Sequence, residues 1–165
     1  MSMIGEYLRV TPSELDRAVN NPEWAQKLAE QVQDEQEDGG LGPEDAKHFS
    51  TYQTWHLLDF LLRRRGFPVD VVMGETEFGG EDWGYEPPRF LSVDRVRVAA
   101  EELGRLSYDD LIDGVDVAEV AAAQIYPQGW DTRESLEWGR DYFGSLALFL
   151  QATSAAGDAV IAWID

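Results

Sequence analysis

Residues 51–66 read TYQTWHLLDFLLRRRG and form the most apolar helix-length stretch of the chain. Trp55, Leu58 and Leu62 recur at helical spacing as one apolar stripe, and a second stripe of leucines lies beside it. A helix that is apolar on more than one side is buried on more than one side. The sequence therefore predicts a central helix around which the rest of the domain packs.

The end of this helix is marked by three arginines, Arg63, Arg64 and Arg65, followed by Gly66. Cations in the last turn interact favourably with the helix dipole, and glycine is the usual residue just beyond a helix C-terminus. Pro68 has a fixed φ angle and no backbone N–H, so we expect the helix to end before it.

Two polar residues, His56 and Asp59, interrupt the apolar stretch. They are three residues apart, so their side chains can meet on the surface of a helix. One interpretation is a structural pair in which the carboxylate holds a half-buried imidazole, which is the commoner role of such pairs. The other is an acid–base pair lining a pocket, because histidine can transfer a proton near neutral pH.

Length and composition indicate one domain spanning residues 1–165, because 44% hydrophobic and 12% aromatic residues supply a single core. The absence of cysteine excludes disulfides, thiolate metal sites and cysteine nucleophiles. The first ten residues lack the basic and apolar regions of a signal peptide, and no apolar run approaches the ~20 residues of a membrane span. We therefore expect a soluble, cytoplasmic protein.

The formal net charge is −19, from 13 basic and 32 acidic residues. Such a chain repels phosphate backbones, so nucleic acid is not an expected partner. In three blocks, residues 28–46, 66–88 and 106–132, every charged residue is acidic. These blocks are either solvated faces that aid solubility or a negative surface that steers a basic protein partner.

Alternating apolar residues predict a strand over residues 3–10 and a closing strand over residues 159–164. The apolar run 69–73 indicates a further short strand or a helical extension. Helix starts are marked by the capping residues Thr11, Asn21, Ser92, Ser107 and Thr132, and the alanine-rich residues 116–124 indicate a further helix. Strands at both ends with helices between them indicate an α+β fold, a single compact domain whose small sheet includes both terminal strands and is packed by several helices.

Aromatic residues gather in two expected loops, one at residues 74–88 and one at residues 125–130. Long loops of small domains are often functional, and aromatic residues and arginine are frequent anchors of recognition surfaces. The alternative is that each aromatic closes the core beneath its loop. The candidate binding residues are His56, Asp59, Trp83, Tyr85, Arg89, Tyr126 and Trp130.

Known reaction and metal motifs are not matched. Residues 109–120 have the glycine of a calcium loop but apolar residues at two of its essential positions, and residues 39–42 lack the lysine of a phosphate-binding loop. The two histidines, His48 and His56, are eight residues apart rather than four. We therefore assign no cofactor, no metal and no catalytic residue. An oxygen-liganded cation could bind only loosely, among Glu75, Glu77, Glu81 and Asp82.

Four segments occur in order along the chain: Met3-Ile4-Gly5-x-Tyr7, Trp55-His56-x-Leu58, Tyr85-x-Pro87-x-Arg89-Phe90-Leu91-Ser92 and Ile125-Tyr126-Pro127-x-x-Trp130. Together they resemble the YfbM-like family (DUF1877), small bacterial proteins of unknown function, and the resemblance runs nearly end to end. It implies a single α+β domain without an established activity, so no catalytic residue is carried over. The family often has histidine where Asp59 stands here, which argues against a fixed proton-transfer role at that position.

Two functions remain open from the sequence. The first is a non-catalytic interaction or inhibitory module, comparable to an immunity protein, whose acidic face masks a basic partner. The second is a small-molecule-binding protein or enzyme with a pocket near His56, Asp59 and the loop aromatics. The missing nucleophile, metal and phosphate signatures favour the first. The sequence names neither a ligand nor an oligomeric state.

Overall fold

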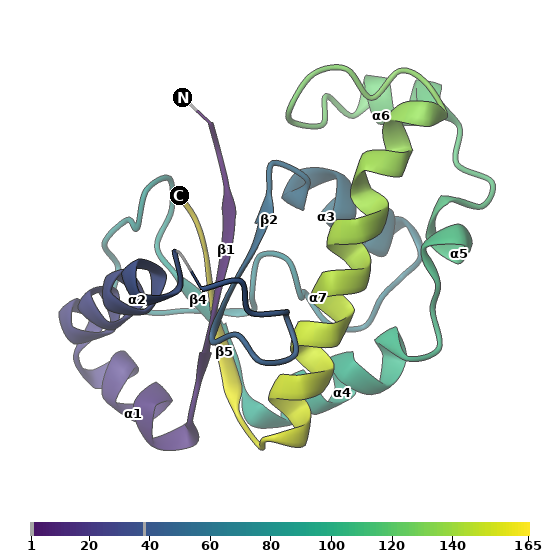
Figure 1. The fold of residues 1–165 in the computed structure, drawn as a ribbon. Coiled ribbons are helices and arrows are strands. Elements are labelled where there is room, and N and C mark those ends of the chain that lie inside the picture. Colours follow the sequence, from purple (N-terminus) through teal and green to yellow (C-terminus); the bar gives the residue numbers. More distant parts are fainter. Residues whose placement is uncertain (1, 38) are drawn as a thin grey trace.

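The computed structural model describes residues 2–37 and 39–165, and in them five strands form one antiparallel sheet of order β2-β1-β5-β4-β3 (Figure 1). The strands are β1 (Gly5–Val10), β2 (His48–Tyr52), β3 (Thr76–Glu77), β4 (Arg89–Leu91) and β5 (Ala159–Ile164). The helices are α1 (Pro12–Asn20), α2 (Pro22–Gln36), α3 (Trp55–Arg64), α4 (Val93–Leu103), α5 (Tyr108–Ile112), α6 (Val117–Ala122), the 3-10 helix η1 (Glu134–Glu137) and α7 (Trp138–Ala155). None of the helices in the described residues is long and apolar enough to cross a membrane.

The two terminal strands pair with each other over their whole length, from Gly5 opposite Ile164 to Val10 opposite Ala159. This confirms the prediction that both belong to the same sheet. Gly5 is required here by close packing, because a Cβ at this position would clash with the Thr51 hydroxyl. The first sequence motif therefore contains a position, Gly5, that only glycine can occupy without a clash.

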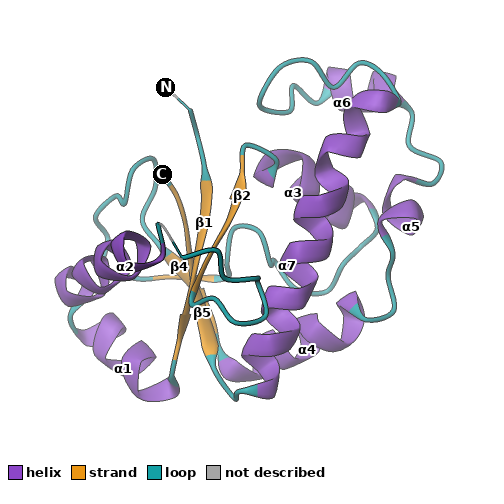
Figure 2. Ribbon diagram, in the orientation of Figure 1, coloured by secondary structure: helices purple, strands orange, loops and turns teal. Residues whose placement is uncertain are grey.

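Helices cover both faces of the sheet, with α1 and α2 on one face and α3, α4 and α7 on the other (Figure 2). Alternation along β1 divides the core accordingly: Tyr7 contributes to the cluster with α3 and α7, and Leu8 to the cluster with α1 and α2. The predicted α+β architecture is confirmed.

Helix α3 is buried as predicted through Trp55, Leu58 and Leu62. It is shorter than the stretch 51–66, because Thr51 and Tyr52 belong to β2. The chain leaves β2 through Tyr52, whose φ of 52° is in the left-handed region, and then enters the helix.

The prediction of a strand or helical extension over residues 69–73 is wrong. This segment is a buried turn, in which the Gly74 N–H donates to the Asp70 carbonyl oxygen at 3.0 Å. Its valines are buried in the core, and the Tyr7 hydroxyl donates to the Val72 carbonyl oxygen at 2.9 Å. Burial and not strand pairing explains the β-branched residues here.

Candidate functional site

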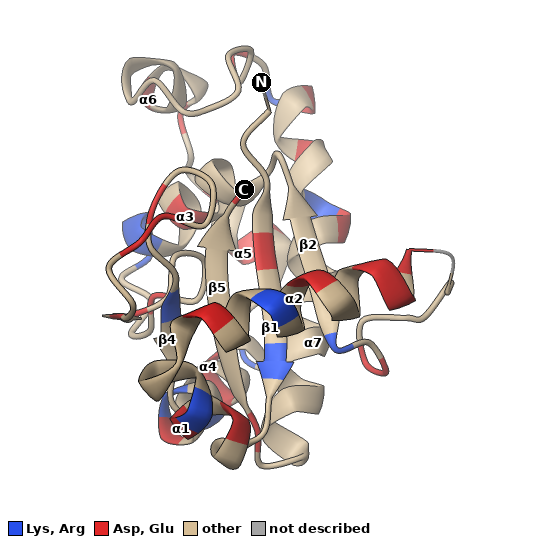
Figure 3. Ribbon diagram, turned by 90° about the vertical axis from the view of Figure 1, so that its left-hand side faces the viewer, with Lys and Arg blue, Asp and Glu red and all other residues tan. Residues whose placement is uncertain are grey.

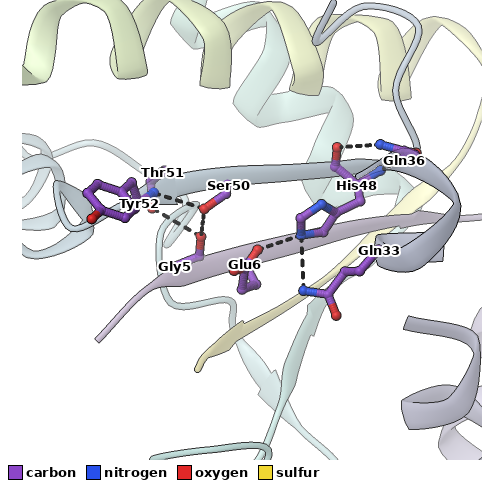
Figure 4. A network of polar contacts seen from close by, with 8 residues as sticks. All are labelled: Gly5, Glu6, Gln33, Gln36, His48, Ser50, Thr51 and Tyr52. Atoms are coloured by element: carbon purple, nitrogen blue, oxygen red, sulfur yellow. Dashed lines mark hydrogen bonds and ion pairs between the residues drawn. The ribbon is translucent and has the colours of Figure 1, made fainter. Parts of the chain in front are cut away.

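A carboxylate–imidazole pair lies on the α2 side of the sheet (Figure 4). The Glu6 Oε2 atom of β1 is 2.5 Å from the His48 Nε2 atom of β2, and the two side chains are only 10% and 16% exposed. The Gln33 amide nitrogen of α2 lies 3.5 Å from the same imidazole nitrogen. Three elements therefore converge on this pair.

The backbone of His48 is held by another side chain of α2. The Gln36 amide donates to the His48 carbonyl oxygen and accepts from the His48 N–H, both at 3.1 Å. Ser50, two residues further on β2, donates to the Gly5 carbonyl oxygen and accepts from the Tyr52 N–H. The Ser50 hydroxyl is thus committed to the backbone rather than to His48, so these residues do not form a nucleophile–base arrangement.

Three hollows follow α2 along the side that faces the sheet and the neighbouring loops. The one at the start of α2, about 350 Å³, is bounded by Gln26 and Trp83. The middle one, about 100 Å³, lies between Gln26, Gln33 and Trp83. The one at the end of α2, about 640 Å³, is bounded by Gln33 and His48. The side of the molecule that carries α2 is therefore hollowed along the length of this helix.

The same side carries a group of carboxylates that have no cationic partner among the described residues. Figure 3 shows acidic residues along α2 and on the loop after α3. Within the described residues, seven exposed carboxylates of this side make no ion pair: Glu30, Asp34, Glu35, Glu37, Glu81, Asp82 and Glu86. The first acidic block and the end of the second, residues 81–86, thus share one face. Glu75, in contrast, is neutralised by Arg95 at 2.7 Å.

The third acidic block lies across the sheet, where α5 and α6 pack with α3 and α7. Several of its carboxylates have local structural roles. Asp110 and Asp116 accept hydrogen bonds at the N-termini of α5 and α6, and Asp109 pairs with Arg140 at 2.8 Å. This block does not extend the α2 side.

The half-buried imidazole of His56 is held by a distant loop. Its Nδ1 atom accepts a hydrogen bond from the Tyr126 N–H at 2.8 Å, and its ring stacks on Trp55. Burial lowers the pKa of His56, and the nearby Asp59 carboxylate opposes this effect. A neutral imidazole that accepts at Nδ1 carries its proton on Nε2.

Asp59 pairs with Arg63, whose guanidinium lies 2.9 Å from Asp59 and 2.8 Å from Asp70. Within the described residues no hydrogen bond joins Asp59 to His56. Burial raises the pKa of Asp70 above its ordinary value, although the Met73 N–H and Arg63 favour its charged form. Instead of the expected pairing with His56, Asp59 shares the Arg63 guanidinium with Asp70.

Trp83 lies beneath its loop rather than on the surface. It is 5% exposed and packs edge-on against Trp163 at 5.4 Å between ring centroids. Tyr85 is exposed, and its N–H donates to the Ile164 carbonyl oxygen. Arg89 is half-buried in β4, opposite Ala162.

Tyr126 and Trp130 lie across the sheet from Trp83. The Tyr126 hydroxyl accepts from the Met3 N–H at 2.9 Å, and the buried Trp130 stacks on Trp138 at 5.5 Å. The structure brings together His56, Tyr126 and Trp130 on this face, while Trp83 and Tyr85 lie at the end of β5 near α2. The seven candidate residues therefore do not converge on one pocket.

The residues that the sequence interpretation missed are Glu6, Gln33 and His48. Glu6 and His48 could have been found by recognising strand β2. The alternation of this strand places His48 and Ser50 on one face and Phe49 on the other. Recognising that strand would have indicated that His48 faces a neighbour on β1.

These features define an α+β domain with helices on both faces of one antiparallel sheet. The chain belongs to the family described as Domain of unknown function (DUF1877), which matches residues 1–163, so the resemblance inferred from the four motifs is confirmed. Among solved structures, it is similar to YfbM, a protein of unknown function from Escherichia coli, at 11% identity and a TM-score of 0.66, with 98% of this chain and 99% of that chain covered. At this identity the similarity shows the fold alone. No curated protein matches the chain.

The pH dependence of stability provides a test of the His56 environment. Because burial lowers the folded-state pKa of His56 below its ordinary 6.5, the unfolded chain binds more protons just below that pH. His56 in its neutral form therefore makes its full contribution to the free energy of unfolding above pH 6.5. This contribution is lost as the pH falls from 6.5 through the lowered folded-state pKa.

His56→Asn should flatten this part of the profile, because its amide oxygen can accept from the Tyr126 N–H without titrating. The measurement is urea unfolding at a series of pH values between about 5 and 8. An unchanged slope in the variant would show that other groups produce the pH dependence.

Proposed function

We propose that this domain is a non-catalytic interaction module that binds a basic protein partner through its α2 side. The observation that carries the proposal is the concentration of seven carboxylates without ion pairs, among the described residues, on α2, just after it, and on the loop between β3 and β4. Clustered charge of one sign creates a potential that accelerates the approach of an oppositely charged protein. As part of the same proposal, binding inhibits the partner, as an immunity protein inhibits its toxin, and it takes place in the cytoplasm.

An enzyme with an acid–base pair at His56 and Asp59 has less support. The Nδ1 atom of His56 already accepts a hydrogen bond from the Tyr126 backbone N–H, and Asp59 forms an ion pair with Arg63. A general base needs a free acceptor within reach of the substrate proton. The environment of these residues is better explained by their structural contacts.

The test is the association rate with a basic protein partner captured from the native cells and then purified. We expect Glu81→Lys, Asp82→Lys and Glu86→Lys together to slow association by about tenfold at low salt, because local charge governs the encounter rate. Raising the ionic strength should slow the wild type more than the variant.

The matched control reverses three exposed carboxylates across the sheet, Asp113→Lys, Asp131→Lys and Glu134→Lys. Both variants change the net charge equally, so a difference between them reports where the partner approaches. Equal association rates for the two variants and the wild type, at low and high salt, would refute the proposal and leave solubility as the role of the acidic residues.

A further inference from the structure

The three hollows beside α2 follow one another along the helix, and together we call them the trough. Neighbouring hollows share a glutamine: Gln26 bounds the first and the second, and Gln33 bounds the second and the third. The α2 residues that line the hollows include one stripe of the helix, which continues to Glu37 just beyond its end. The stripe consists of Glu23, Gln26, Glu30, Gln33 and Glu37. Because these positions are three or four residues apart, they face the same direction along the whole helix.

The dimensions of the trough suit a peptide in an extended conformation. Between Glu23 and Glu37 the helix rises by ~21 Å, at 1.5 Å per residue. An extended chain covers this length with about six or seven residues. The middle hollow, of about 100 Å³, is narrow. It has room for the end of one side chain rather than for a helix, which is about 10 Å wide.

The walls of the trough are acidic. The described lining residues include Glu23, Glu30, Asp34, Glu37, Glu81 and Asp165 but neither lysine nor arginine. The nearest cation on α2 is Lys27, which pairs with Glu23 at 3.3 Å on the exposed surface. The rings of Trp83 and Trp163 line the middle hollow, where the aliphatic part of a long cationic side chain could pack.

The helix already shows how such a peptide would be held. The Gln36 amide binds both the N–H and the carbonyl oxygen of His48, at the outer edge of β2. Gln26 and Gln33 carry the same donor and acceptor pair and face the trough. A glutamine of α2 therefore pairs with extended backbone in this molecule, and two further glutamines are placed to do so.

We propose that the trough along α2 binds a short, extended, lysine- or arginine-rich segment of the partner. The carboxylates bind alternate cationic side chains, and Gln26 and Gln33 bind the peptide backbone. This inference rests on the proposed function, since it specifies which part of the acidic side makes the contact and in which conformation the partner is bound.

The probe is a blocked seven-residue peptide of alternating lysine and threonine, titrated into the ¹⁵N-labelled protein. We expect the indole N–H signals of Trp83 and Trp163 to shift, because both rings line the middle hollow. The signals of Trp130 and Trp138, across the sheet, should remain in place. A peptide in which glutamate replaces each lysine should shift none of them.

Gln26→Leu with Gln33→Leu removes the two amides without changing the charge, and we expect it to weaken peptide binding by about tenfold. Gln31→Leu is the matched control, because Gln31 is exposed on the same helix but lines none of the three hollows, and it should leave binding unchanged. Circular dichroism verifies that each variant is folded.

The outcomes separate this inference from the proposed function. If the double glutamine variant and the wild type bind the peptide equally, while reversal of Glu81, Asp82 and Glu86 weakens binding, the inference about the trough is wrong and the proposed interaction through the acidic face is retained. If the peptide shifts no signal of Trp83 or Trp163 and reversal has no effect on partner association, both are wrong. Shifts of these two signals together with weaker binding by the double variant support the trough.

Discussion

Leu58→Ala is expected to lower the free energy of unfolding by about 2–5 kcal/mol, the usual cost of truncating a large buried side chain. Leu58 is 0% exposed in α3 and belongs to the larger of the two core clusters. The substitution leaves a cavity that helices packed against the sheet can fill only in part. Urea unfolding followed by tryptophan fluorescence measures the loss.

Leu148→Ala is the matched control, because Leu148 is also helical but is 47% exposed on α7. A surface substitution of this kind changes the free energy of unfolding by less than about 0.5 kcal/mol. An equally small loss for Leu58→Ala would contradict the central position of α3 in the core.

The sequence was sufficient for the parts of the fold that have local signals. The predicted helix starts at Thr11, Asn21, Ser92 and Ser107 are correct, because each side chain accepts a hydrogen bond from its own first turn. Thr132 instead precedes the 3-10 helix η1, and α7 begins only at Trp138. Capping depends on residues within one turn, so a sequence can show it.

Three of the five strands in the described residues were missed, and all three are short. Strands β3 and β4 contain two and three residues, too few for a period of two to be visible. Strand β2 directly precedes the most apolar helix of the chain, and its pairing with β1 joins residues 40 or more positions apart. Such partners are determined by the tertiary fold and not by the local pattern.

The candidate site was harder to predict for the same reason. The spacing of His56 and Asp59 permits a contact, but Asp59 also lies one turn from Arg63, and the guanidinium is the stronger partner. The backbone N–H that donates a hydrogen bond to the His56 Nδ1 atom belongs to Tyr126, 70 residues away. Nothing local to either segment indicates this contact.

The charge pattern illustrates how the fold combines distant segments. The acidic residues of α2 and those of the loop between β3 and β4 come together because Phe78 and Trp83 of that loop pack in the same core cluster as α2. The block that contains α5 and α6 is equally acidic in sequence but packs on the opposite face. Composition therefore gives the net charge, while topology decides which carboxylates form a common surface.

Trp83→Ala is expected to lower the free energy of unfolding by about 3–5 kcal/mol, as truncation of a buried tryptophan usually does. The binding interpretation of the sequence predicted that this truncation would speed the dissociation of a partner, while the alternative placed Trp83 in the core beneath its loop. At 5% exposure, between Phe78 and Trp163, Trp83 instead belongs to the core beneath α2. Its removal should loosen the packing between the loop and the helix.

Trp138→Ala provides the matched comparison, because this tryptophan is 41% exposed and stacks on Trp130 with one side of its ring. We expect it to lose only about 1 kcal/mol, the range of an aromatic pair at the surface. Urea unfolding of both variants tests the difference, and a loss for Trp83→Ala no larger than that for Trp138→Ala would contradict the burial of Trp83. Because Trp83→Ala disturbs the packing beneath α2, weaker partner binding by this variant does not identify Trp83 as a contact, whereas the charge reversals and the glutamine substitutions alter the surface directly.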